Sequence, residues 1–183
     1  MADLKARQRV AIAGTVTNLD TGDIVPQVVV RITEAPPGFV AMLMATVEAV
    51  LVNHPELMAH YGHLLNRAIT ADTLKTAQIL LDSFERHHWL STLRQDQTIT
   101  GGDGHYCFFD LPPGPYTITG TVTTLNHRCG LVQAQVEVKQ TELRLAFSRL
   151  DLAVALRPVQ LAIPAQGLRR NLTLDTVPLL SRS

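Results

Sequence analysis

Apolar residues follow two different periods along the chain, and the change of period divides the sequence into four segments. Between residues 8 and 35, apolar residues alternate with other residues, which is the period-two pattern of half-buried β-strands. The alternation predicts two strands, at about residues 10–17 and 28–33, separated by a turn at 18–26 that is rich in Asp and Gly. Pro36-Pro37-Gly38 ends this segment, because proline cannot continue a strand ladder.

Residues 38–96 carry apolar side chains at helical spacing instead. Phe39 and Val47 lie on one predicted stripe. Pro55 fits the first turn of a second helix, where its missing N–H costs nothing, and Thr70 suits the N-cap of a third. The segment therefore predicts a helical insertion, made either of three helices or of a helical hairpin kinked at Pro55.

Strand patterns return between residues 97 and 157, interrupted by the turn 101–104 and continuing as alternation over 131–138 and 143–156. Residues 158–183 contain three prolines and short alternating pieces such as Leu172 and Leu174. This last segment is too short for a domain, but it is richer in Leu and Val than a disordered tail. It predicts an extended C-terminal arm.

Several short motifs follow one another in the order found in a known family. They are Ala13-Gly14-Thr15-Val16, Thr21-Gly22, the strand 27–32, the Asp103-Gly104 turn, the aromatic strand through Tyr106 and Phe108, and Leu111-Pro112-Pro113-Gly114 before Tyr116. In these motifs, about half of the chain resembles the carboxypeptidase regulatory-like domain. The resemblance implies an α+β protein with a seven-stranded transthyretin-like Greek-key β-sandwich. Residues 8–35 and 97–157 would form this sandwich, with the helical insertion at 38–96 and the C-terminal extended arm at 158–183.

The predicted aromatic strand is apolar on both faces. Tyr106 and Phe108 share one face, and Cys107 and Phe109 share the other. A strand with two apolar faces needs cover on both. We therefore expect the helices to pack on the outer face of one sheet; the alternative is that this face meets another protein.

Composition and charge narrow the classes of partner. Sixteen Lys and Arg balance sixteen Asp and Glu, which argues against nucleic-acid binding and against a polybasic membrane surface. The longest apolar stretch, 39–52, is shorter than the ~20 residues of a membrane span, and no signal-peptide pattern opens the chain. The sequence predicts a cytoplasmic protein that can join a larger particle. Two cysteines, Cys107 and Cys129, make no disulfide framework.

The histidines supply the candidate chemistry. Glu56, His60 and His63 are spaced i, i+4 and i+7 on the predicted second helix and are the candidate metal ligands. A zinc site needs three or four converging ligands, which His87 or His88 could complete if the second and third helices paired suitably. A solvated polar helix face explains the same spacing without any metal. The sequence thus predicts no cofactor and no catalytic residues.

These patterns favour a non-catalytic structural or interaction module over an enzyme. The expected role is an accessory or adaptor subunit of a larger protein assembly, of which a contractile injection or phage-tail-like particle is one setting. Protein partners, or other copies of the chain, would bind through the C-terminal arm, the helical insertion or both. Two alternatives remain: a carbohydrate- or ligand-binding β-sandwich, which needs an exposed aromatic platform, and a metal-binding protein that uses the helical histidines.

Overall fold

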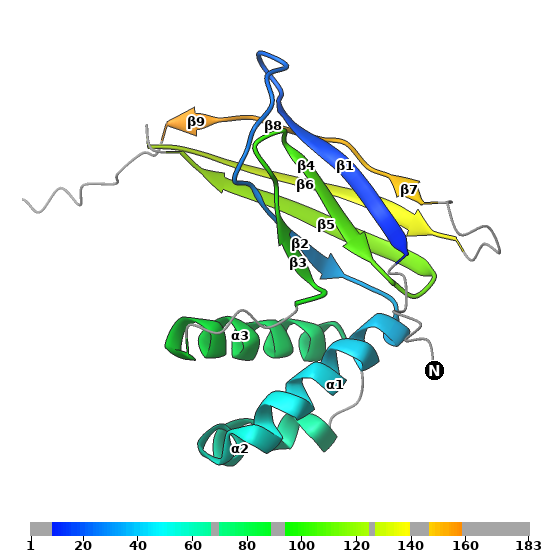
Figure 1. The fold of residues 1–183 in the computed structure, drawn as a ribbon, viewed down its shortest axis with the longest axis vertical. Coiled ribbons are helices and arrows are strands. Elements are labelled where there is room, and N and C mark those ends of the chain that lie inside the picture. The colour runs from blue at the N-terminus through cyan, green and yellow to red at the C-terminus, as the bar shows by residue number, and fades with distance from the viewer. Residues whose placement is uncertain (1–8, 67–69, 89–93, 125–126, 140–146, 159–183) are drawn as a thin grey trace, which may run out of the picture.

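The protein is an α+β chain with two β-sheets and three α-helices (Figure 1). The computed structural model describes residues 9–66, 70–88, 94–124, 127–139 and 147–158. The strands in the described part are β1 (Val10–Asn18), β2 (Val29–Glu34), β3 (Gln97–Ile99), β4 (His105–Phe109), β5 (Gly114–Thr123), β6 (Arg128–Val138), β7 (Ser148–Arg149), β8 (Leu152–Val154) and β9 (Arg157–Pro158). The helices are α1 (Pro37–Asn53), α2 (Pro55–Tyr61) and α3 (Ala71–His88), with a 3-10 helix η1 (Gly62–Asn66).

The two sheets are mostly antiparallel. In the four-stranded sheet β1 is central, with antiparallel β4 on one side and parallel β7 and β8 on the other. The five-stranded sheet has the order β3-β2-β5-β6-β9, and all its pairs are antiparallel. Alternate side chains of these strands are buried, as the period-two pattern predicts. Buried members include Ile12, Val16, Val30, Ile32, Ile118 and Val122.

The described part of the alternation at 143–156 forms two short strands, β7 and β8, rather than one continuous strand. β7 and β8 both lie beside β1, but residues 150–151 between them belong to neither. Here the Asp151 carboxylate accepts a hydrogen bond from the Thr15 N–H at 3.0 Å. The Leu150 carbonyl approaches Gly14 so closely that a Cβ at Gly14 would overlap it. This local approach of two backbones interrupts the ladder, although the hydrophobic pattern continues.

The helical insertion contains three α-helices, which is the first of the two predicted forms. α1 ends at Asn53, because His54 adopts φ −133° and ψ 81°, outside the helical region. Pro55 then starts α2 at its first turn, as predicted. α2 is only seven residues long and continues into η1, so the chain reverses before α3 begins.

Thr70 caps α3, which confirms the predicted N-cap. Its Oγ1 accepts a hydrogen bond from the Thr73 N–H at 3.3 Å, and the Thr73 Oγ1 accepts one from the Thr70 N–H at 3.3 Å. We expect Thr70→Ala to lower the free energy of unfolding by about 1 kcal/mol, because the cap satisfies one otherwise unpaired N–H. Urea denaturation followed by circular dichroism measures this loss. Thr46→Ala, inside α1, is the control, and an equal loss in both variants would contradict the capping role.

The helices and the sheets share one hydrophobic core. Phe39 on α1 packs edge-on against Tyr116 on β5, with ring centroids 5.8 Å apart. Helix side chains such as Leu43, Leu74 and Leu81 are buried in the same cluster as the strand residues. Figure 1 shows the helices grouped along the β2–β3 side of the strands, with β7, β8 and β9 on the opposite side.

The helices meet the outer face of the five-stranded sheet only at β2, where Arg31 contacts Asp82 on α3, so the expected cover is incomplete. On the outer face of the five-stranded sheet, Thr33, Thr121 and Thr123 remain exposed. On the other sheet, Cys107 and Phe109 are only half-buried. The reason is connectivity: α1 starts three residues after β2 ends, so the helices gather beside the end of β2 rather than over its neighbours.

Candidate interaction surfaces

The candidate metal ligands do not converge. Glu56 and His60 lie on α2, but α2 ends at Tyr61 and His63 falls in η1, so the three do not share one α-helix. The His54 Nδ1 lies 3.1 Å from the Glu56 Oε1, and His60 and His63 are exposed. Within the described residues, no group of three or more His, Cys, Asp or Glu side chains is placed to hold a metal ion. The side chains of His87 and His88 lie outside the described part.

Most aromatic side chains of the described chain are in the core. Phe39, Phe84, Tyr106, Phe108 and Tyr116 are buried. Phe147 is exposed, and Tyr61 and Phe109 are half-buried on different elements. Trp89 lies outside the described residues. The described surface therefore lacks the flat aromatic platform that the carbohydrate-binding alternative requires.

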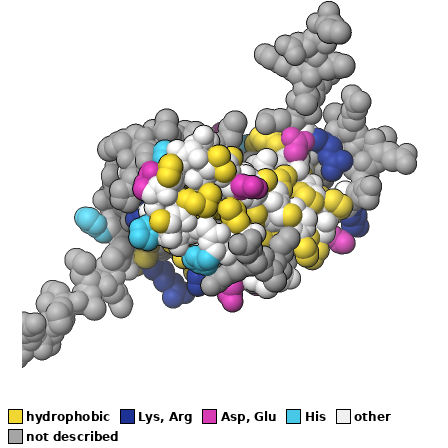
Figure 2. All heavy atoms as spheres, turned by 90° about the horizontal axis from the view of Figure 1, so that it is seen from below, with side chains coloured by type: hydrophobic (Ala, Val, Ile, Leu, Met, Phe, Trp, Pro, Cys, Tyr) yellow, Lys and Arg dark blue, Asp and Glu magenta, His cyan; other side chains and the backbone are white. Residues whose placement is uncertain are grey.

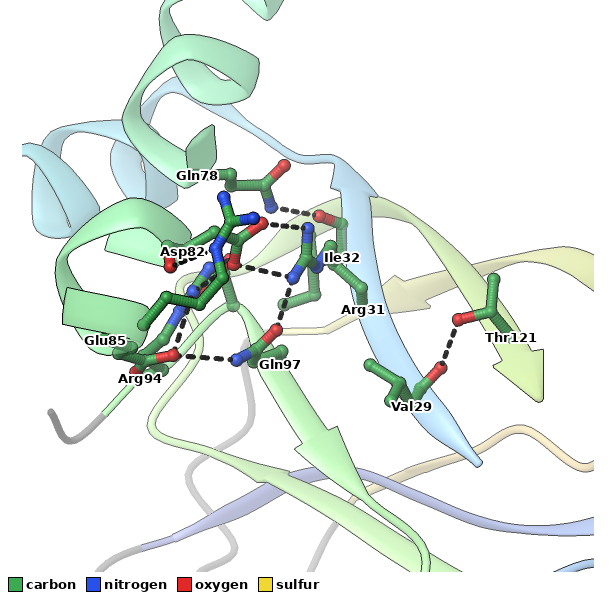
Figure 3. Close-up of polar contacts among 11 residues, drawn as sticks. Val29, Arg31, Ile32, Gln78, Asp82, Glu85, Arg94, Gln97 and Thr121 are labelled. Carbon is green, nitrogen blue, oxygen red and sulfur yellow. Dashed lines mark hydrogen bonds and ion pairs between the residues drawn. The ribbon is translucent and has the colours of Figure 1, made fainter. Parts of the chain in front are cut away.

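A charged network fastens α3 to β2 (Figure 3). Arg94 binds the Asp96 carboxylate through two nitrogens, at 2.9 and 2.6 Å, and Asp82 through a third at 2.5 Å. Arg31 on β2 forms a second two-pronged pair with Asp82, at 2.9 and 3.0 Å. The side chains of Arg94 and Asp96 are 3% and 0% exposed. Paired carboxylates of this kind hold guanidinium groups in a fixed plane.

The network keeps Asp82 and Arg94 charged. Burial alone would raise the pKa of the Asp82 carboxyl, but hydrogen bonds from Arg31 and Arg94 outweigh it and hold that pKa below its ordinary value of 3.8. Burial likewise opposes the charge on Arg94, but the Asp96 and Asp82 carboxylates keep its pKa above the ordinary value. Asp82 and Arg94 therefore stay ionised and bound to each other at neutral pH.

Gln78 completes the junction between α3 and the sheet. Its Nε2 donates a hydrogen bond to the Ile32 carbonyl at 2.7 Å, at the level where β3 begins. The Ile32 N–H donates to the Asp96 carbonyl at 2.8 Å. The Gln78 side chain thus donates to a β2 carbonyl the hydrogen bond that the backbone of a longer β3 would donate.

An open groove of about 660 Å³ lies beside this network. Its apolar floor comes from Val29 and from Ile99, which is 58% exposed. Its charged walls include Arg31 and Asp82, which already bind each other. The groove therefore offers apolar contact, while its ionic groups serve the helix–sheet junction. Its lining residues are Val29, Arg31, Asp82, Glu85, Arg86, Gln97 and Ile99.

The outward side of α1 is a second open surface. The helix packs its buried side on the core, yet its exposed side is also mostly apolar. Figure 2, which views the molecule from the helical side, shows hydrophobic side chains across this face with charged and histidine side chains scattered among and around them. The exposed residues of α1 after Gly38 are Ala41, Ala45, Glu48, Ala49, Val52 and Asn53.

The β5–β6 region of the five-stranded sheet is a third open surface. Thr121 and Leu131 face each other across these strands on the outer side, and Leu131 is 68% exposed. A hollow of about 500 Å³ lies here, bounded by Cys129, Leu131 and Arg157 among others.

Cys107 and Cys129 are both free thiols, Cys107 half-buried and Cys129 exposed. Burial raises the pKa of the Cys107 thiol.

Sequence reasoning missed the charged network. The one signal was Arg31, a charged residue at an outward position between the apolar residues Val30 and Ile32. Its partner Asp82, and the Arg94 that shares this carboxylate, belong to the end of the helical insertion, and no spacing rule connects them to β2. In contrast, the apolar exposed side of α1 was visible in the long apolar stretch 39–52.

Comparisons with protein-family models, with curated proteins and with solved structures found no significant match to this chain. None of the helices in the described part of the chain combines the length and the apolar character that crossing a bilayer requires.

Proposed function

We propose that this protein is a non-catalytic interaction module that serves as an accessory or adaptor subunit of a larger protein assembly. The observation that carries the proposal is the composition of α1. Of its 17 residues, Glu48, Asn53 and Thr46 alone carry polar side chains. A helix that is apolar on all sides is normally buried on all sides. α1 is buried on one side by its own core, so a partner protein would cover the other.

The charged groups support the same proposal. Arg31, Asp82 and Arg94, in and beside the groove of about 660 Å³, bind one another through the Asp82 carboxylate and join α3 to β2. A site built for chemistry would instead direct some of its ionisable groups toward the space where a substrate binds. The arrangement is that of a rigid scaffold, in which the helices are held at a fixed angle to present their outer side.

We further propose that the two sheets form a sandwich of the transthyretin type, as in carboxypeptidase regulatory-like domains. The support comes from the Leu111-Pro112-Pro113-Gly114 corner between β4 and β5. Gly114 adopts φ +139°, and the Tyr116 hydroxyl donates a hydrogen bond back to the Pro112 carbonyl at 2.7 Å. β7 and β8, placed end to end along β1, then act as the seventh strand, with β9 as an addition.

Sedimentation of the full chain in extracts of the cells that make it tests the function. We expect the chain to sediment in a particle larger than the purified chain forms alone. Ala45→Arg combined with Ala49→Arg should release it from that particle, because two charges would enter an apolar contact while arginine still favours helix. Lys75→Glu, on the exposed side of α3, is the control and should leave the particle intact. Equal sedimentation of extract and purified chain would contradict the proposal.

A further inference from the structure

Among the described residues, nothing pairs with one edge of the five-stranded sheet over the middle of β6. β6 pairs with β5 from Cys129 to Val138. On its other side β9 pairs only with Arg128 and Cys129, and the Ser148 hydroxyl donates to the Glu137 carbonyl at 2.6 Å. Between these two contacts, no described residue pairs with the outward edge of β6.

The register identifies which backbone groups face this open edge. The Thr124 N–H donates to the Arg128 carbonyl at 2.8 Å, so residues 124 and 128 are a hydrogen-bonded pair. Hydrogen-bonded pairs alternate along an antiparallel ladder. The N–H and C=O groups of Leu131, Gln133 and Gln135 therefore point away from β5, into the open edge.

The open edge also lacks the residues that protect free edges. Natural edge strands carry charges, prolines or bulges that prevent pairing with another chain. Residues 129–136 contain no Lys, Arg, Asp, Glu or Pro, and the pairing of β6 with β5 has no register shift. Leu131, Gln133 and Gln135 are exposed on the outer face. An unprotected edge of this length is typical of a strand that receives a partner strand.

The direction of β9 indicates where that partner strand comes from. Arg157 lies opposite Cys129 and Pro158 opposite Arg128, in antiparallel orientation. At Arg157 and Pro158 the chain therefore runs toward the start of β6, away from its open stretch. The chain continues for 25 residues, 159–183, which can span up to ~80 Å when extended. Within them, 171–177 contains no Pro or Gly and places Leu172 and Leu174 in alternation.

We propose that residues 171–177 of one copy add as a strand to the β6 edge of a second copy. The inference rests on the proposed interaction function and names a partner for a surface other than α1. To reach its own β6, the arm would have to reverse past β9 and run parallel to β6. An arm from another copy can pair antiparallel, which is the more stable arrangement per residue.

The mass of the purified full-length chain tests this proposal. Light scattering should give at least twice 20.1 kDa for the natural chain. Gln133→Pro should at least halve the mass, because proline removes an N–H that faces the open edge and none that pairs with β5. Gln133→Ala keeps that N–H and should keep the natural mass. A natural chain that stays monomeric at all concentrations, or an oligomer that Gln133→Pro leaves intact, overturns the proposal.

A mixing experiment separates donor from acceptor. The Gln133→Pro chain keeps a donor arm but no acceptor edge. A chain with Leu172→Asp and Leu174→Asp keeps the edge but loses the apolar face of its arm. Each variant should be monomeric alone, and the mixture should form a dimer of about twice the mass. Circular dichroism confirms that both variants are folded, and two folded variants that do not combine overturn the proposal.

Amide hydrogen exchange gives a readout that does not require Gln133→Pro to fold. In the natural chain, the N–H groups of Leu131, Gln133 and Gln135 should exchange slowly, and they should exchange faster in the chain with Leu172→Asp and Leu174→Asp. Slow exchange in a monomer means that the arm binds its own chain, which overturns the second copy as partner. A natural chain that does not self-associate, while the large particle in extracts persists, refutes this inference and leaves the proposed function standing.

Discussion

Replacing Arg94 with methionine should lower the free energy of unfolding by about 3–5 kcal/mol, because it leaves a buried carboxylate without its partner. The Asp96 side chain is fully buried, and Arg94 binds both of its oxygens. Asp82 would lose one of its two guanidinium partners at the same time. Urea denaturation at pH 7 measures the loss, and a decrease below about 1 kcal/mol, the scale of a surface pair, would contradict it.

A double variant separates charge from packing. Arg94→Met combined with Asp96→Asn removes the unpaired buried charge while it keeps the shape of the Asp96 side chain. It should recover part of the stability that Arg94→Met loses, because a neutral amide costs less to bury than a carboxylate. If the single and double variants were equally unstable, the loss would come from the packing of Arg94 rather than from its charge.

The free energy of unfolding at acidic pH also tests the contact between Asp82 and Arg94. The pKa of Asp82 is lowered in the folded protein, so this carboxylate stabilises the fold above its ordinary value of 3.8. Its contribution is lost as the pH falls from that value through the lowered folded one. The Arg94→Met variant should show a smaller loss from Asp82 in this range, because Arg31 alone then lowers its pKa.

Gly14→Ala should destabilise the fold by about 3 kcal/mol or more, at or beyond the upper end of ordinary overpacking. The added Cβ would overlap the Leu150 carbonyl oxygen and would lie 3.1 Å from the Tyr106 Cε1. Both neighbours are held in place, since the Tyr106 hydroxyl donates to the Leu150 carbonyl and the Leu150 N–H donates to the Ala13 carbonyl. Thermal denaturation measures the loss as a lower Tm.

Gly102→Ala is the matched control for this prediction. A Cβ on Gly102 meets no atom within 4 Å, and its φ is not positive. Its stability should stay within about 0.5 kcal/mol of the natural chain, as for most surface substitutions. If Gly14→Ala lowered the stability as little as Gly102→Ala, the strands beside β1 could move apart without cost. The close approach of Leu150 would then not restrict the residue at position 14.

Local signals in the sequence predicted the positions of the helix starts and of most strands. Pro55 and Thr70 begin helices because the first turn needs residues that tolerate or satisfy unpaired N–H groups, and this requirement is local. The strand alternation around Tyr106 likewise follows from burying every second residue. Local spacing was a poorer guide to the candidate metal ligands. Glu56, His60 and His63 do not converge, because α2 ends at Tyr61.

Local patterns in the sequence specify the period of each segment, the helix starts, and the apolar character of α1. Packing of the whole chain sets where the helices lie, which carboxylates surround Arg94, and that the strand opposite Gly14 breaks at Leu150. The difference arises because periods and caps depend on neighbours a few residues apart. Contacts such as Arg31 with Asp82 join segments about fifty residues apart, and only the packed chain brings them together.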